Sequence, residues 1–109
     1  MTGTLFLVQR ASAAVLALAS AVHLATIVYA VRGGLTAGEI LERTAGNTAY
    51  LAFYMVFVAA VAVHAPIGLR NVVREWVGWQ GRTSDAVLAV LALALFALGA
   101  RAVMALYLA

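Results

Sequence analysis

Two histidines are the residues of this sequence whose type and setting best suit cofactor chemistry. His64 stands in VAVHAPIGLRNVVREW, six residues before Arg70, and His23 stands in LALASAVHLATIVYA. An ionisable group inside an apolar segment is by default a functional-site hypothesis, and neutral imidazole is a common ligand of haem iron. The alternative for each residue is a histidine that hydrogen-bonds a neighbouring helix and holds no cofactor. The residues alone leave both interpretations open.

The neighbours of His64 favour ligand binding. Ala60 and Gly68 lie one helical turn before and after it, and small side chains there would leave room for a flat macrocycle. Pro66 removes one backbone hydrogen bond, which predicts a local bend. The face around His23 is mostly small and slightly polar, which suits a ligand and a packed helix equally well.

The two histidines are predicted to lie at different depths. His23 follows Arg10 by thirteen residues, whereas His64 precedes Arg70 by six, and both arginines belong to the same side of the membrane. At a rise of 1.5 Å per residue these separations are ~20 Å and ~9 Å. The mismatch of about 10 Å argues against one shared iron. Two haems, each completed by a histidine from another chain, fit better.

The elements that position these residues are apolar helices. The chain has 109 residues, 66% of them hydrophobic and 10% charged, with uncharged stretches at 11–31, 44–69 and 86–100. A span needs about 20 mostly apolar residues. The first two stretches meet this length, and the third meets it by continuing past Arg101 to the C-terminus, with that guanidinium reaching to the interface. We therefore predict an all-α membrane protein forming one domain, with transmembrane helices at about 5–31, 47–74 and 84–108. A short interfacial helix is expected at about 37–43, because Thr36 and Glu39 have capping-box spacing. Thr83, Ser84 and Asp85 are expected to cap the third span.

Charge and composition restrict the partners. The net charge of +3 comes from seven arginines without lysine, which in a membrane protein concerns orientation and headgroups rather than nucleic acid. Four arginines fall on the N-terminal side and three on the other, which favours a cytoplasmic N-terminus. The chain has no cysteine, so it holds no iron–sulfur cluster of its own. Tyr29 and Tyr50 are interpreted as interfacial belt residues, the alternative being quinone ligands.

The segments LVQRASAAVLALASAVHL and HAPIGLRNVVREW together resemble the membrane-anchor cytochrome b subunit of succinate dehydrogenase and fumarate reductase. The second carries the closer likeness, with a histidine, glycine, arginine and acidic residue at His64, Gly68, Arg70 and Glu75. The first departs from the family pattern at Gln9 and Ala13, and Phe6 replaces a serine of the family's quinone site.

The resemblance implies a role for each candidate residue. His64 would be an axial ligand of haem b, and His23 would be a ligand of a second haem, as in the two-haem branch of the family. Arg10 would lie near a quinone site or a haem propionate. Apart from the resemblance, Arg70 and Arg74 could bind propionates through forked hydrogen bonds, the alternative being ordinary positive-inside anchoring. Glu39 and Glu42 are candidates for a quinone's proton acceptor, the alternative being a solvated amphipathic turn.

The implied function is that of a non-catalytic subunit in the bacterial inner membrane. It would pass electrons between an iron–sulfur subunit and membrane quinone, in a complex with a flavoprotein and with a second anchor chain or another copy of itself. Two alternatives remain, a small transporter and a structural subunit without cofactor. Coupled transport needs an intramembrane carboxylate, and none lies in the middle of a predicted span.

Overall fold

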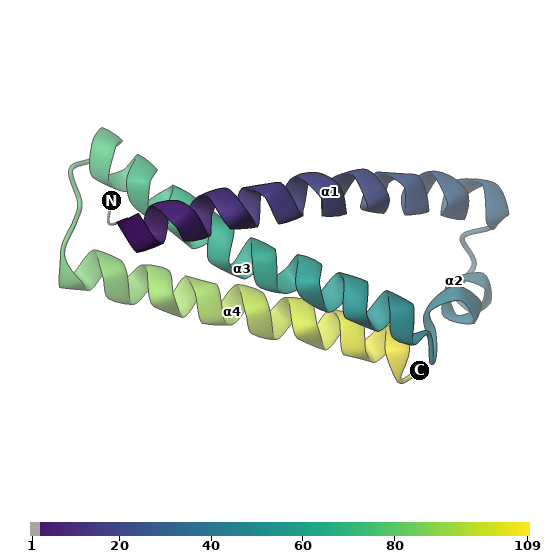
Figure 1. Cartoon of the computed structure of the whole chain (residues 1–109). Coiled ribbons are helices and arrows are strands. Elements are labelled where there is room, and N and C mark those ends of the chain that lie inside the picture. The colour runs from purple at the N-terminus through teal and green to yellow at the C-terminus, as the bar shows by residue number, and fades with distance from the viewer. Residues whose placement is uncertain (1–2) are drawn as a thin grey trace.

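The computed structural model describes residues 3–109, which form three long helices and one short one (Figure 1). The helices are α1 (Gly3–Gly33), α2 (Ala37–Thr44), α3 (Thr48–Trp76) and α4 (Arg82–Tyr107). The three long helices are each long and apolar enough to cross a membrane. The predicted fold class is confirmed: this is a helical multi-pass membrane protein with a short helix between the first two spans.

The helix ends on the α2 side follow the local sequence. Gly34 ends α1 with φ +116°, a left-handed conformation that favours glycine, and its N–H donates to the carbonyl of Ala30. The Thr36 hydroxyl caps α2 by accepting from Glu39 N–H at 3.2 Å. The Asn47 side chain caps α3 by accepting from Tyr50 N–H at 3.1 Å. These caps explain why the predicted boundaries here lie close to the observed ones.

The start of α4 differs from the prediction. The helix begins at Arg82, its N-cap is Gly81, and no side chain makes a capping hydrogen bond. Asp85 instead points across to α3, where its carboxylate accepts from Arg70 Nε at 3.0 Å. Ser84 is buried, and its hydroxyl has no partner within residues 3–109. The expected capping by Thr83, Ser84 and Asp85 was therefore wrong, because the helix begins before these residues and the Asp85 carboxylate pairs with Arg70.

The helix α3 lies between α1 and α4 and contacts both of them (Figure 1). The buried positions are few and mostly small, including Ala19, Ala60 and Ala62. Small side chains let helix backbones approach closely in lipid, where packing rather than the hydrophobic effect holds helices together. Many large aliphatic side chains of α1 and α4, such as Leu18 and Leu93, are exposed, as lipid-facing side chains are, whereas Leu88 and Val103 are buried.

Gly99 allows the closest approach of α4 to α3. A Cβ at this position would lie 2.6 Å and 2.9 Å from the two γ-methyl carbons of Val58. We expect Gly99→Ala to destabilise the helix pair by about 1–3 kcal/mol through overpacking. Thermal unfolding in detergent micelles, followed by circular dichroism, measures the change. Gly38→Ala is the matched control, because no atom lies within 4 Å of its Cβ position; equal melting temperatures for the two variants would contradict the prediction.

Candidate functional site

The His64 ring is held by a hydroxyl from the facing helix. Its Nδ1 lies 3.3 Å from Ser12 Oγ on α1, and Ser12 Oγ donates to the carbonyl of Gln9 at 3.1 Å. A hydroxyl has a single proton. With that proton on the Gln9 carbonyl, Ser12 can only accept from His64, so the neutral imidazole carries its proton on Nδ1. Nε2 is then left with a free lone pair, the form that binds iron.

The space expected around His64 is partly filled by α1. A Cβ at Gly68 would lie 3.3 Å from Gln9 Nε2, so the Gln9 amide occupies the room that glycine leaves. Ala60 is also buried. The open faces predicted one turn above and below the ring are therefore packing positions here. The helix α3 itself continues through Pro66 as far as Trp76.

The His23 ring is held in the same way by a longer chain of hydrogen bonds. Its Nδ1 lies 2.8 Å from Tyr54 Oη, and Tyr54 Oη lies 3.0 Å from Thr26 Oγ1. Thr26 Oγ1 in turn donates to the backbone carbonyl of His23 at 2.6 Å. Three hydrogen bonds need three protons, and the two hydroxyls supply two. The third must sit on His23 Nδ1, so the neutral ring again leaves Nε2 as a free lone pair. Tyr54 and Phe57 also contact the ring edge-on, with centroid distances of 5.5 Å and 5.4 Å.

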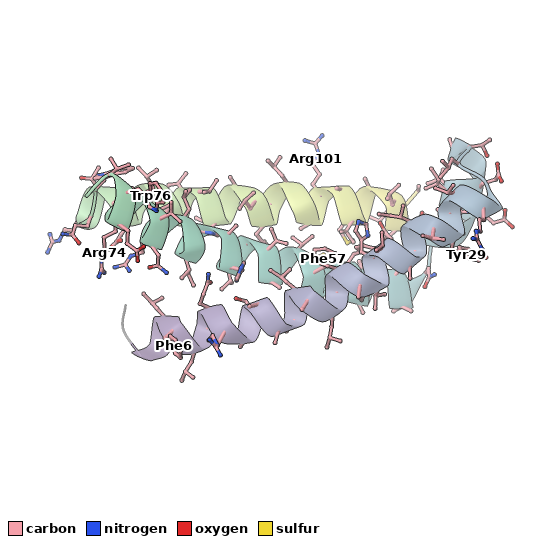
Figure 2. All side chains as sticks on the ribbon, turned by 90° about the horizontal axis from the view of Figure 1, so that it is seen from above. Phe6, Tyr29, Phe57, Arg74, Trp76 and Arg101 are labelled. Atoms are coloured by element: carbon pink, nitrogen blue, oxygen red, sulfur yellow. The ribbon has the colours of Figure 1, made fainter. Side chains whose placement is uncertain are left out.

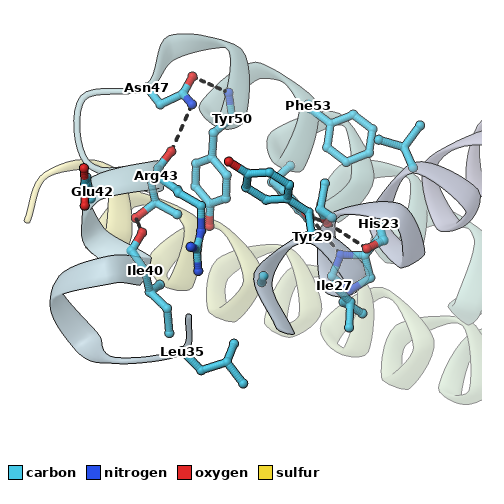
Figure 3. Close-up of a pocket in the computed structure, with 15 residues that line it drawn as sticks. His23, Ile27, Tyr29, Leu35, Ile40, Glu42, Arg43, Asn47, Tyr50 and Phe53 are labelled. Carbon is cyan, nitrogen blue, oxygen red and sulfur yellow. Dashed lines mark hydrogen bonds between the residues drawn. The ribbon is translucent and has the colours of Figure 1, made fainter. Parts of the chain in front are cut away.

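A cavity of about 850 Å³ opens beside His23, between α1, α2 and the first turns of α3 (Figure 3). Its walls are mostly apolar, and the polar side chains on them include Tyr50, Tyr54 and Arg43. A second cavity of about 260 Å³ lies between α3 and α4, and His23 lines this one as well. Cavities of several hundred Å³ with apolar walls and a few polar groups are typical of ligand sites. His23 therefore has space on two sides.

The depth difference between the two histidines is present in the structure. Ser12 pairs with His64 and His23 pairs with Tyr54, so α1 and α3 run antiparallel. Each pair lies at one depth along the bundle, and the two pairs lie at different depths. Tyr54 and His64 are ten residues apart on α3, which is ~15 Å at 1.5 Å per residue. The expected separation was about 10 Å. The chain therefore places one imidazole at each of these two depths of the bundle.

The two candidate arginines lie near the end of the bundle that carries the N-terminus. Arg10 is exposed, and its guanidinium carbon lies 5.6 Å from the ring centroid of Phe6. Arg70 is committed to Asp85 through Nε, whereas its Nη1 is buried and has no partner within residues 3–109. Arg70 therefore keeps one buried donor available for an acidic group. Neither arginine hydrogen-bonds to His64 within residues 3–109.

Sequence reasoning missed the residues that orient the imidazoles, above all Tyr54 and Ser12. Tyr50 was assigned to the interface belt, yet it faces the cavity (Figure 3). The available signal was an aromatic stripe at helical spacing, formed by Tyr50, Phe53, Tyr54 and Phe57. Consecutive ring contacts along this stripe build one wall beside His23.

Compared with models of known protein families, with curated proteins and with solved structures, the chain matches none of them. The geometry of the two imidazoles is therefore the main observation from which a function can be argued.

Replacing Tyr54 with phenylalanine is expected to release the His23 tautomer. The loss of one neutral hydrogen bond, worth about 1 kcal/mol, shifts the ratio of Nδ1–H to Nε2–H forms by roughly fivefold. Solid-state ¹⁵N NMR of histidine-labelled protein in bilayers measures this ratio. Tyr50→Phe is the matched control, since Tyr50 lies on the same stripe without a hydrogen bond to His23; identical spectra for the two variants would show that Tyr54 does not set the tautomer.

Proposed function

We propose that the chain is a haem b-binding membrane-anchor subunit of a succinate dehydrogenase or fumarate reductase. The observation that carries the proposal is the pair of oriented imidazoles at two depths of the span. In each, a hydroxyl on the facing helix engages Nδ1 and leaves Nε2 free. Metal-bound histidines in proteins almost always donate their other ring N–H in this way, which fixes the tautomer and raises ligand basicity.

His64 and His23 would each hold one haem b through Nε2, His23 with open space beside it and His64 with its surroundings partly filled by the Gln9 amide. The two imidazoles lie at different depths, so a residue of a partner chain would complete each site. When bound, haem b supplies a one-electron carrier between an iron–sulfur subunit and membrane quinone. Ser12 and Tyr54 orient the ligating rings. The free Nη1 of Arg70 suits a charge-assisted hydrogen bond to a propionate, and Arg10 lies near the same end of the bundle.

The cavity beside His23 is the place on this chain best suited to the quinone. Its apolar walls suit a prenylated ring. The Tyr50 hydroxyl makes no hydrogen bond within residues 3–109, so it is free to donate to a quinone carbonyl. Asn47 is less suitable, because its side chain already bonds the carbonyl of Arg43 and the N–H of Tyr50. Glu42 also lines the cavity and remains the candidate proton acceptor, whereas Glu39 is engaged by Thr36.

The partners follow from what the chain lacks. It has no cysteine for an iron–sulfur cluster, so the electron path needs an iron–sulfur subunit and a flavoprotein from other genes. A second anchor chain or another copy of this chain completes the haem ligands. The arginine distribution favours a cytoplasmic N-terminus in the bacterial inner membrane, with the soluble subunits on that side.

A cofactor-free structural subunit is the second candidate. It is favoured by the packing of His64 against Ser12 and by the Gln9 amide beside Gly68, since both are ordinary helix–helix contacts. Transport is less well supported, because the Asp and Glu residues of the chain all lie at or beyond the ends of the three long helices.

Co-expression with the neighbouring genes tests the proposal. The complex is purified from membranes through a tag on this chain, and its reduced-minus-oxidised spectrum and subunits are determined. We expect a b-type haem band together with flavoprotein and iron–sulfur subunits. A complete complex without haem, or a chain that purifies with unrelated subunits, would refute the proposal.

A further inference from the structure

The outer segment of α1, residues 27–33, is held to the other long helices by very little. Figure 2 shows α1 crossing α3 near Phe57 and carrying Tyr29 at its far end. The last hydrogen bond between α1 and α3 is at Thr26, whose Oγ1 lies 3.0 Å from Tyr54 Oη. Beyond it, no hydrogen bond or ring contact joins α1 to α3 or α4 in the part of the chain that the structure describes. The segment is ~10 Å long at 1.5 Å per residue, and it forms one wall of the larger cavity.

A single side chain of α2 holds the end of this segment. Arg43 Nη2 donates to the carbonyl of Gly34, directly after α1, at 2.6 Å. The Arg43 guanidinium carbon also lies 5.8 Å from the centroid of the Tyr29 ring (Figure 3). No other hydrogen bond joins α2 to residues 3–35. Arg43 therefore fastens the outer end of α1 across the mouth of the cavity.

The helix α2 is itself fixed to α4. Thr44 Oγ1 donates to the carbonyl of Leu106 at 3.5 Å. The N–H of Gly46 donates to the carbonyl of Tyr107 at 2.9 Å. Because α4 packs along α3, these three helices form one body, and residues 27–33 of α1 reach that body through Arg43.

The inner end of the segment has a point at which the helix bends easily. Thr26 Oγ1 donates to the carbonyl of His23, three residues earlier, at 2.6 Å. A side chain that bonds a carbonyl of the preceding turn competes with the backbone hydrogen bonds of the helix and often bends it. At the outer end, Gly34 has φ +116° and leaves the helix. The segment thus has a pivot at Thr26 and a latch at Arg43.

We propose that residues 27–33 of α1 form a gate to the cavity beside His23. The gate turns about Thr26 when Arg43 releases Gly34, and the gap that opens between α1 and α3 admits an apolar ligand directly from the lipid. Gating of this kind sets access to many ligand sites. The inference rests on the proposed function only in naming the ligand as a prenylated quinone. The movement itself needs neither quinone nor haem.

Distances between spin labels test the gate. The chain has no cysteine, so cysteines introduced at the exposed Val31 and Ala49 carry the only two labels. Double electron–electron resonance in lipid nanodiscs then measures the spread of distances from the gate to α3. We expect Arg43→Ala to raise the ratio of open to latched forms roughly tenfold, as the loss of one hydrogen bond from a charged group implies. A second pair, Leu18 with Ala49, lies before the pivot on α1 and should keep its distances.

Arg32→Ala is the matched control, because it removes an exposed arginine from the same segment without breaking a hydrogen bond of the structure. Tyr29→Leu removes only the ring beside the guanidinium, should give a smaller rise, and provides a second variant if Arg43→Ala does not fold. Equal distance distributions for Arg43→Ala, or for Tyr29→Leu in its place, and for Arg32→Ala would overturn the proposal. An equal shift of the Leu18 pair would also overturn it, because α1 would then move as a whole.

Added decylubiquinone separates the gate from the proposed function. We expect it to return the Val31–Ala49 distances of Arg43→Ala toward the latched form, because a bound ring contacts both walls of the cavity. A gate that opens in Arg43→Ala and does not respond to decylubiquinone would support the movement and refute the quinone as its ligand.

Discussion

Replacing His64 with alanine is expected to remove the haem that this residue ligates from the assembled complex, lowering the b-type band. His64 Nε2 is the one imidazole nitrogen with a free lone pair at its level of the chain, because Nδ1 is engaged by Ser12. Loss of an outer-shell partner alone typically costs 10–100-fold in metal affinity. Loss of the ligand itself should therefore lower occupancy of this haem at least about tenfold. The reduced-minus-oxidised spectrum of the purified complex, normalised to the amount of this chain, measures the effect.

Ser12→Ala is the informative companion to this variant. It keeps the imidazole and removes its hydrogen-bond acceptor, so we expect a smaller loss of haem than in His64→Ala, and an altered midpoint potential for the haem that is retained, because outer-shell hydrogen bonds tune the iron. A potentiometric titration distinguishes the two variants. An undiminished haem band in an assembled His64→Ala complex would instead identify His64 as a packing residue that bonds Ser12. The structural-subunit interpretation would then be preferred at this level of the chain.

The helices could be predicted from the sequence because their signals are local. Two uncharged stretches of span length, and a shorter third one that continues past Arg101, set the three long helices. The residues at Thr36 and Asn47 set two of the helix starts. The prediction failed at the start of α4, where Asp85 serves α3 instead of its own helix end. That choice depends on the distance to Arg70 on another helix, which no local pattern contains.

The environment of the histidines could not be predicted for the same reason. Which hydroxyl meets His64 or His23 depends on the register of α1 against α3, and a one-residue shift rotates a helical side chain by about 100°. The register places Ser12 at His64 and Tyr54 at His23, and it also puts the Gln9 amide beside Gly68. The residue types therefore indicated what each histidine can do, whereas the space available to each became clear only from the packing. The space beside the rings favours His23 as the haem ligand, whereas the sequence alone had favoured His64.

Replacing His23 with alanine is expected to lower the haem content of the complex by about half. His23 and His64 lie ~15 Å apart along α3 by their hydrogen-bond partners, so each serves a different iron and loss of one leaves the other. The remaining haem should titrate as a single potentiometric transition where the wild type shows two. Haem per complex, from the pyridine haemochrome spectrum and the protein concentration, measures the change.

Tyr54→Phe provides the control for this prediction. It removes the hydroxyl that holds His23 Nδ1 and keeps both the imidazole and the aromatic wall formed with Phe57. More of the His23 haem should be retained than in His23→Ala, with its potential altered. If instead His23→Ala leaves haem content and both potentials unchanged in an assembled complex, His23 serves only to bind Tyr54 across the α1–α3 contact. The adjoining cavity would then be a quinone or lipid site without a haem beside it, and His64 alone would carry the cytochrome assignment.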